Sequence, residues 1–584
     1  MISFRRAVQV ASLLFVLIAA ARFVKSQAIG DTVAPLQERQ VQPNAVTAYQ
    51  LQKYLMRQIP KPAAPATAEQ WNVEAQKLRK HILDDVAYHG WPQEWIGSTP
   101  RFEQTEVIET SHGYRVRKYR YEIVPGFEST AILYEPEQLS GRVPAILNLT
   151  GHEPLGNLTE YEQKRCINFA KRGILALSLG WPGLGELGQP ENNHDFAGQL
   201  DLVGSNALGF FYLIVRRGLD FLTTLPNTDA KRIGVTGLSG GGWQTIMISA
   251  LDKRVNVMVE VAGWYENIDP GTHNYQLDNR QQAYAFFSEH FHLASITKEI
   301  PSDSELFTPL QLAGSLPKGN LTTLGLARKL ASQIHRDAIP AVGERDAWAK
   351  SQREQLKSII RYSPVSVDSA WKLASEKPPG LQSISYRFDF SNSLSATGIW
   401  VARRAAAADA PLTILLNDKG YKASARHVAE RVNRGEQVLA FEPIFFGSTS
   451  PDETEPAYWE MLVASRGDRA IGLEVGQLIA AAKSFRSSTD LNNLCLITDG
   501  IRSQVVALVA AALEPDLFSV IESNNAMTSL SYLLDAPIPY RTAPDLFCLD
   551  LYKHFDIDRM TMLAYPAKAT ILSKIVFLPA SVSN

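Results

Sequence analysis

The feature that most constrains the fold is the run Ile-Gly-Val-Thr-Gly-Leu-Ser-Gly-Gly-Gly-Trp at residues 233–243. It is typical of a buried strand that turns sharply, through the pentapeptide 237–241, into an apolar helix at about residues 243–251. This is the G-x-S-x-G pattern of a nucleophile elbow in the strand–turn–helix context that it needs. Glycines flank the serine because side chains there would collide with neighbouring backbone. The run predicts that Ser239 attacks an acyl carbonyl; the alternative is a glycine-rich turn with an idle serine.

Length and composition limit the number of domains and the class of protein. A chain of 584 residues is too long for one compact core, so two or more domains are expected. Apolar residues make up 45% and charged residues 20%, as in ordinary globular proteins, and a net charge of −2 gives no sign of nucleic-acid binding or of a polybasic membrane surface. The three cysteines are far apart, so they indicate neither a disulfide framework nor a metal site.

The N-terminus has the pattern of a targeting segment. Two arginines precede an apolar run at residues 11–21, and Ser-Gln-Ala at 26–28 fits a small-x-small cleavage site. The run is too short for a comfortable membrane span, so no stable membrane insertion is expected. We interpret residues 1–28 as a signal peptide, with an uncleaved anchor as the alternative because basic residues flank the run. Either way the body of the protein is expected to be exported, to the periplasm or outside the cell.

Strand patterns alternate with helical patterns around the serine motif. Residues 114–123 and 129–134 predict an antiparallel hairpin. Apolar runs typical of buried strands follow, with helical segments between them: strands are expected at 144–149, 173–178, 232–236 and 255–261, and helices at 160–172 and 207–224. This order predicts a mostly parallel, doubly wound sheet of the α/β-hydrolase fold, with ligands beyond the carboxyl ends of the strands.

The second half of the chain repeats the first. Asn-Arg-Gly at 433–435 matches Lys-Arg-Gly at 171–173, an offset of 262 residues (433 against 171), and the same offset aligns Ala-Leu at 512–513 with 250–251. A shared offset predicts a tandem duplication. It places Ile501 opposite the nucleophile, so the second copy is expected to be degenerate and non-catalytic. Ser503 is a poor replacement because no glycine flanks it.

These patterns predict five segments. They are a signal peptide at 1–28, an N-terminal helical lead-in at 29–99, an α/β-hydrolase domain at 100–292, a connecting helical segment at 293–380, and a degenerate hydrolase-like domain at 381–584.

A serine nucleophile also needs a base, an orienting acid and an oxyanion hole. His273 lies in a glycine-containing loop before a predicted helix and is the expected base. Gly240 and the loop at His152 are expected to supply the oxyanion-hole N–H groups. The His152 ring is expected at the pocket rim, and His194 in a structural or rim position.

The position of the acid is less clear. Residues 263–272 are too few to hold the helix and strand that usually carry it. The acid is therefore Asp269 or Glu266, or another segment supplies it, or part of the fold is absent.

Two stretches carry a family resemblance. Gly-Leu-Ser-Gly-Gly-Gly-Trp-Gln-Thr at 237–245 and Asp-Pro-Gly-Thr-His-Asn-Tyr at 269–275 resemble exported bacterial α/β-hydrolases of the acetyl xylan esterase and dienelactone-hydrolase-like group. The resemblance covers about residues 100–292 and, more weakly, 380–570. It implies that Ser239 is the nucleophile and His273 the base. Family members typically carry the acid on a strand between the two, and no such strand is recognisable here.

The sequence therefore predicts a serine hydrolase of carboxylic esters, with acetyl esters on polysaccharide as candidate substrates. No cofactor is required, because oriented donors alone can polarise a carbonyl. Two alternatives stay open. One is a serine peptidase of the same fold, and the other is an inactive binding or scaffold protein that lacks its acid.

Overall fold

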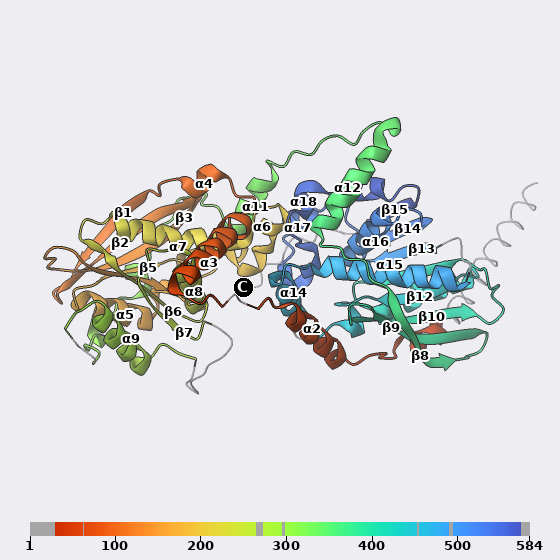
Figure 1. Ribbon diagram of the computed structural model, residues 1–584, viewed down its shortest axis with the longest axis horizontal. Coiled ribbons are helices and arrows are strands. Elements are labelled where there is room, and N and C mark those ends of the chain that lie inside the picture. The colour runs from red at the N-terminus through yellow and green to blue at the C-terminus, as the bar shows by residue number, and fades with distance from the viewer. Residues whose placement is uncertain are drawn as a thin grey trace, which may run out of the picture. The chain divides into compact units, whose positions relative to one another are not determined.

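The computed structural model describes residues 30–61, 64–263, 273–294, 298–452, 455–489 and 494–573. The chain divides into two compact units, which we treat separately (Figure 1). The first unit comprises residues 62–334, and the second comprises residues 1–61 together with 335–584. The predicted signal peptide lies outside the described residues.

The first unit is built on a seven-stranded sheet with the order β1-β2-β3-β5-β4-β6-β7. Strands β1 to β3 form an antiparallel meander, β3 pairs antiparallel with β5, and β5, β4, β6 and β7 are parallel. The parallel strands β4 and β5 are buried along almost their whole length, as apolar runs predict. The bounds are β1 Phe102–Glu109, β2 Tyr114–Val124, β3 Phe127–Pro136, β4 Val143–Leu149, β5 Leu175–Leu179, β6 Thr228–Leu238 and β7 Val257–Val261.

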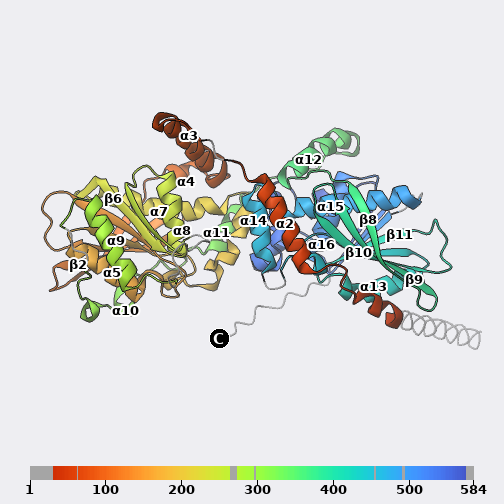
Figure 2. The ribbon, with the colours of Figure 1, turned by 60° about the horizontal axis from the view of Figure 1, so that its bottom comes forward.

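Helices cover both faces of this sheet. Helices α5 and α9 lie together on one face, and α7 and α8 lie on the other (Figure 2). The side chain of Phe169 on α5 packs edge-on against Tyr284 and Phe287 of α9. The bounds are α3 Ala68–His81, η1 Ile82–Ala87, α4 Gln93–Gly97, α5 Glu160–Lys171, α6 Gly198–Leu202, α7 Ala207–Thr224, α8 Gly240–Leu251, α9 Leu277–His290, α10 Pro309–Leu312 and α11 Thr323–Ala331.

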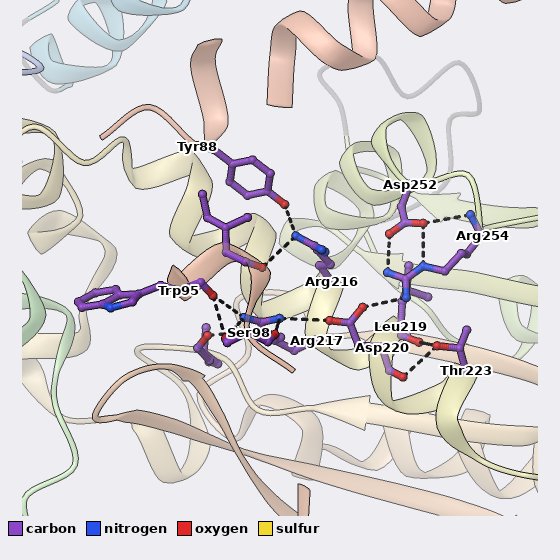
Figure 3. Close-up of polar contacts among 12 residues, drawn as sticks. Tyr88, Trp95, Ser98, Arg216, Arg217, Leu219, Asp220, Thr223, Asp252 and Arg254 are labelled. Atoms are coloured by element: carbon purple, nitrogen blue, oxygen red, sulfur yellow. Dashed lines mark hydrogen bonds and ion pairs between the residues drawn. The ribbon is translucent and has the colours of Figure 1, made fainter. Parts of the chain in front are cut away.

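Two arginines on α7 hold the segment that leads into the sheet (Figure 3). The Arg217 guanidinium is buried and donates to the carbonyl oxygens of Trp95 at 2.7 Å and Ser98 at 2.8 Å. Arg216 donates to the Tyr88 hydroxyl at 2.8 Å. Asp220, one turn further along α7, accepts from Arg217 and from Arg254. The chain between η1 and β1 is thus tied to α7 by charge-assisted hydrogen bonds.

The second unit contains an eight-stranded sheet with the order β15-β14-β13-β11-β12-β10-β9-β8. Its strands are β8 Val367–Glu376, β9 Leu381–Phe390, β10 Ser395–Arg403, β11 Leu412–Asn417, β12 Gln437–Glu442, β13 Leu494–Asp499, β14 Val520–Asn524 and β15 Lys568–Leu572. Its helices are α2 Asn44–Gln58, α12 Arg345–Ile359, α13 Ala425–Asn433, α14 Pro456–Ser465, α15 Ala470–Thr489, α16 Ile501–Leu513, α17 Tyr532–Asp535, α18 Leu551–His554 and α19 Ile557–Leu563.

The two sheets share one strand order. Read from the antiparallel edge, β8-β9-β10-β12-β11-β13-β14 reproduces β1-β2-β3-β5-β4-β6-β7 strand for strand. Helix α16 follows β13 as α8 follows β6. The predicted fold class, a mostly parallel α/β fold in two copies, is therefore confirmed. Strand β15 has no counterpart among the described residues of the first unit.

The N-terminal residues complete the core of the second unit. Leu51 and Leu55 of α2 are buried in one cluster with Ile444 and Phe445. The predicted lead-in at 29–99 is thus divided between the units at residue 61, and the predicted connecting segment at 293–380 is divided at residue 334. Among the described residues no single helix has the length and apolar composition needed to cross a membrane, and one sharply bent pair, 194–202 with 207–224, meets that test by length and composition alone.

Candidate active site

Ser239 forms the turn between β6 and α8. Its backbone has φ 58° and ψ −117°, a conformation that costs free energy for any residue with a side chain. The Ser239 N–H donates to the carbonyl oxygen of Val261 at 2.9 Å, at the end of β7, and the Ser239 carbonyl oxygen accepts from the Trp243 N–H at 2.9 Å. The serine is half-exposed while the strand before it is buried. This is the geometry that a nucleophile elbow requires.

The flanking glycines are needed because backbone approaches them closely. A Cβ on Gly237 would lie 2.6 Å from the carbonyl oxygen of Leu149, and one on Gly241 would collide with the same oxygen. A Cβ on Gly151 would lie 2.7 Å from the carbonyl oxygen of Leu238. The elbow is therefore pressed against the end of β4 and the loop that follows it.

That loop places His152 beside the first residue of α8. A Cβ added to Gly240 would lie 2.9 Å from Cε1 and 3.1 Å from Nδ1 of His152, so the imidazole edge faces this glycine. The N–H groups in the first turn of a helix have no intrahelical acceptor and attract negative charge. Gly240 and the His152 loop thus lie together at the start of α8, where the sequence places the oxyanion hole.

His152 contacts His194, for which the sequence predicts a structural or rim position. His152 Nε2 lies 3.3 Å from Nδ1 of His194, and His194 Nε2 accepts from the Trp181 indole at 3.0 Å. Burial is the leading cause that lowers the pKa of both imidazoles, and in His194 the neighbouring His152 lowers it further. The sequence signal for this contact is indirect: the two histidines follow β4 and β5, which are neighbours in the sheet.

His273 lies at a pocket next to the elbow. The pocket has a volume of about 620 Å³ and is lined by His273 and by Leu238, the residue before the serine. His273 is exposed, and among the described residues no hydrogen bond joins it to Ser239. Asp269 and Glu266 lie outside the described residues. The base and the acid therefore stay predictions.

Acidic side chains outnumber basic ones around this pocket. Arg280 makes two bonds to the Glu299 carboxylate, of 2.6 and 2.7 Å. Lys164 contacts Glu160 at 2.5 Å and Asp303 at 2.7 Å. Both cations are thus already paired with carboxylates. Within the described residues, His, Cys, Asp and Glu side chains form no group that could hold a metal ion.

The second unit keeps the two backbone hydrogen bonds of the elbow, with a glycine where the serine would be. Gly500, with φ 118°, precedes α16; its N–H donates to the Asn524 carbonyl oxygen at 3.0 Å and its carbonyl oxygen accepts from the Gln504 N–H at 3.2 Å. These are the backbone bonds of Ser239. Gly500, and not the Ile501 that the sequence offset predicts, takes the place of the serine, because the helix begins one residue earlier relative to the repeat.

A carboxylate occupies this second elbow. Asp418, directly after β11, accepts from the backbone N–H groups of Arg502 at 3.0 Å and Ser503 at 2.8 Å. All three carboxyl atoms of Asp418 lie within 2.6 Å of the position that a Cβ on Gly500 would take. The N–H groups of the second and third residues of α16 are thus bound to a carboxylate of the same unit.

Comparison with known proteins identifies the region around the serine. Residues 98–301 match the family model described as acetyl xylan esterase, which confirms the resemblance drawn from the motifs. Because acetyl xylan esterases cleave carboxylic esters, this region is related to ester-cleaving enzymes. A search of curated proteins finds no match to the chain.

Three of the solved structures that the chain matches are esterases. A methylesterase is 21% identical over 50% of this chain and 55% of its own, with a TM-score of 0.29. Acetyl xylan esterase 1 from Thermoanaerobacterium is 20% identical over 32% of this chain and 62% of its own, with a TM-score of 0.25. A glucuronoyl esterase from Solibacter usitatus is 15% identical over 40% of this chain and 67% of its own, with a TM-score of 0.26. The chain thus spans less than two thirds of the first two proteins.

Proposed function

We propose that the first unit is a serine hydrolase that cleaves carboxylic esters through an acyl-enzyme on Ser239, and that its substrates are acetyl esters on polysaccharide. The observation that carries this proposal is the left-handed backbone of Ser239 between β6 and α8. It lies inside the region that matches the acetyl xylan esterase family.

In the proposed reaction, Ser239 Oγ attacks the ester carbonyl and His273 takes its proton. The negative charge on the tetrahedral carbonyl oxygen is stabilised by the Gly240 N–H and an N–H of the His152 loop. His273 then protonates the leaving alcohol, and water hydrolyses the acyl-enzyme by the same steps in reverse. Asp269 is proposed to orient His273. The reaction requires no cofactor.

We propose that a sugar ring binds in the pocket beside Leu238, which His273 lines and Ser239 does not. Its volume of about 620 Å³ is in the usual range for small-molecule sites. Tyr161 and polar side chains line it, which suits a sugar ring with hydroxyl groups. We further propose that the protein works outside the cytoplasm, with residues 1–28 as its signal peptide.

The test is hydrolysis of p-nitrophenyl acetate and acetylated xylan by the chain without residues 1–28. We expect Ser239→Ala and His273→Ala each to lower kcat by about four to six orders of magnitude, because nucleophile and base act as one unit. Ser503→Ala, at the second elbow, and His112→Ala, in an exposed turn, are the controls and should keep the wild-type rate. A wild-type rate equal to that of Ser239→Ala would contradict the proposal.

The acid is tested in the same assay. If Asp269 orients the base, Asp269→Asn lowers kcat by about 10⁴-fold while Glu266→Gln does not. The opposite result assigns the role to Glu266.

A second function is favoured by one observation, namely that no hydrogen bond joins Ser239 and His273 among the described residues. In that case the first unit binds acylated carbohydrate without cleaving it. Fluorophosphonate labelling distinguishes the hydrolase from the binding protein, because only an activated serine reacts. A labelled enzyme that cleaves peptides and not acetyl esters would indicate the peptidase alternative.

A further inference from the structure

Three loops meet at the carboxyl end of the first sheet. The order β5-β4-β6 makes their strands neighbours. The loop after β6 is the elbow with Ser239, the loop after β4 carries His152, and the segment after β5 carries Trp181 and His194. His152 therefore lies between the elbow and the aromatic side chains that follow β5.

The three rings form a chain of polar contacts. The Trp181 indole N–H donates to Nε2 of His194 at 3.0 Å, and Nδ1 of His194 lies 3.3 Å from Nε2 of His152. Phe211 packs against both Trp181 and His194, with ring centroids 5.4 Å apart in each pair. Trp181 and Phe211 thus hold the ring of His194 on two sides. The chain of contacts ends at Nδ1 of His152, on the edge of the imidazole that faces Gly240.

The proton positions follow from the buried end of this chain. Trp181 is 5% exposed, and its indole N–H can only donate. Its acceptor is Nε2 of His194, so neutral His194 carries its proton on Nδ1, and this N–H donates a hydrogen bond to Nε2 of His152. Neutral His152 then carries its own proton on Nδ1.

The opposite tautomer is disfavoured. The carbonyl oxygen of Pro182 also lies 3.0 Å from Nε2 of His194 and would accept a hydrogen bond from it if Nε2 carried the proton. That arrangement would leave the Trp181 N–H without its acceptor, and buried N–H groups without acceptors are rarer than carbonyl oxygens without donors. Burial lowers the pKa of both histidines and thereby favours the neutral rings that this chain requires.

We propose that the imidazole of His152 is an additional oxyanion-hole donor: its Nδ1–H binds the carbonyl oxygen that becomes negative when Ser239 attacks. His194 and Trp181 are positioning residues that hold the His152 ring and its tautomer. This inference rests on the proposed serine hydrolase function and adds a side-chain donor to the backbone N–H groups. A neutral donor at this point suits a charge that exists only in the transition state.

The first test is the pair His152→Leu and His152→Asn, assayed with p-nitrophenyl acetate. Leucine removes the donor, and the loss of one oxyanion-hole donor lowers kcat by about 10²–10³-fold with little change in KM. Asparagine places an amide N–H near the position of Nδ1, so His152→Asn should recover at least about tenfold of that loss. A base could not be replaced in this way, because an amide does not accept a proton. His112→Leu, in an exposed turn, is the control.

The second test is a double-mutant cycle with His194. His194→Phe keeps a ring against Phe211 and removes both nitrogens, and His194→Asn keeps a donor toward His152. We expect His194→Phe to lower kcat about tenfold, His194→Asn to restore part of it, and His194→Phe to have no further effect in the His152→Leu background. A merely structural role would give additive losses and no rescue.

The outcomes separate this inference from the function on which it rests. A wild-type enzyme that depends on Ser239, together with a His152→Leu variant of unchanged kcat, overturns the inference alone. A His152→Asn variant no better than His152→Leu overturns the donor role. A wild-type chain that neither hydrolyses the ester nor reacts with a fluorophosphonate overturns both.

Discussion

At the scale of single residues, Arg502 in the second unit faces more acid than one cation can neutralise. Its Nε donates to Asp545 at 2.8 Å, and its Nη2 lies 3.6 Å from Glu460 and 3.7 Å from Glu474. Burial is the first cause that raises the pKa of both glutamates well above the ordinary value, and the nearby Asp545 raises it further. The folded state therefore holds protons there that the unfolded chain releases at neutral pH.

The protons held by these buried glutamates make the stability of the second unit depend on pH. Because the folded pKa values are raised, the stabilisation is fully present below the ordinary glutamate value of 4.5 and is lost as the pH rises through the folded values. Burial also raises the pKa of Glu442 to about 7, which places part of the loss between pH 4.5 and 7. We expect hydrogen exchange of the α16 amides, corrected for intrinsic rates, to show falling stability from pH 5 to 9.

Glu474→Gln should make the stability of the second unit fall less steeply with pH. The reason is that a neutral amide replaces a carboxyl group that must stay protonated in the folded state. Exposed Glu38→Gln is the matched control and should leave the slope unchanged. The interpretation is wrong if both variants keep the wild-type slope.

At the scale of elements, α7 organises the chain that enters the first sheet. Arg217 is 1% exposed and donates to carbonyl oxygens of α4 and of the residue that follows it (Figure 3). Arginine suits this place because one guanidinium can bond several acceptors at once. Removing it leaves the carbonyl oxygens of buried Trp95 and of Ser98 without this donor.

We expect Arg217→Leu to lower the free energy of unfolding of the first unit by about 3 kcal/mol, the range for breaking a buried hydrogen-bond network. Urea unfolding gives the change, and hydrogen exchange should locate it in residues 82–98. Arg101→Leu, whose side chain is 87% exposed and 3.8 Å from Glu122, is the control and should have little effect. Equal losses in the two variants would contradict the role of Arg217.

The elements also show which parts of the fold can be predicted from sequence. The buried parallel strands lie close to their predicted positions, because a short apolar run bounded by turn residues is typical of a strand that is covered on both faces. Strands β1 and β8 were missed: their side chains are mostly exposed, so no apolar alternation marks them, and backbone pairing with β2 and β9 defines them.

The candidate site likewise has parts that the sequence predicts and parts that it does not. Ser239 was predicted because a single local run specifies the turn. The contact between His152 and His194 was not, because it depends on β4 and β5 being neighbours in the sheet, and no local pattern encodes that.

At the scale of the whole molecule, the two units do not follow one another along the chain. The first unit is continuous, whereas the second is assembled from both sides of it. Leu51 of α2 is fully buried against Ile444 and Phe445, nearly four hundred residues later. The core of the second unit is therefore completed by residues that are synthesised before the first unit.

We expect Leu51→Ala to destabilise the second unit by about 3 kcal/mol, because it leaves a cavity in a buried cluster. Hydrogen exchange should show the loss in peptides from residues 335–573, while the proposed esterase activity and the protection of the first unit stay unchanged. Met56→Ala, on the same helix but 62% exposed, is the matched control. Equal loss of protection in both units would contradict this assignment.

The carboxylate at the second elbow restricts how that unit can change. A serine at position 500 would place its Cβ within 2.6 Å of the Asp418 carboxyl group, so Gly500→Ser alone is sterically blocked. Removing Asp418 first would leave the N–H groups of Arg502 and Ser503 without their acceptor. Each of these single substitutions therefore carries a penalty of its own. The packing of one aspartate against one glycine thus keeps this turn from gaining a nucleophile by a single substitution.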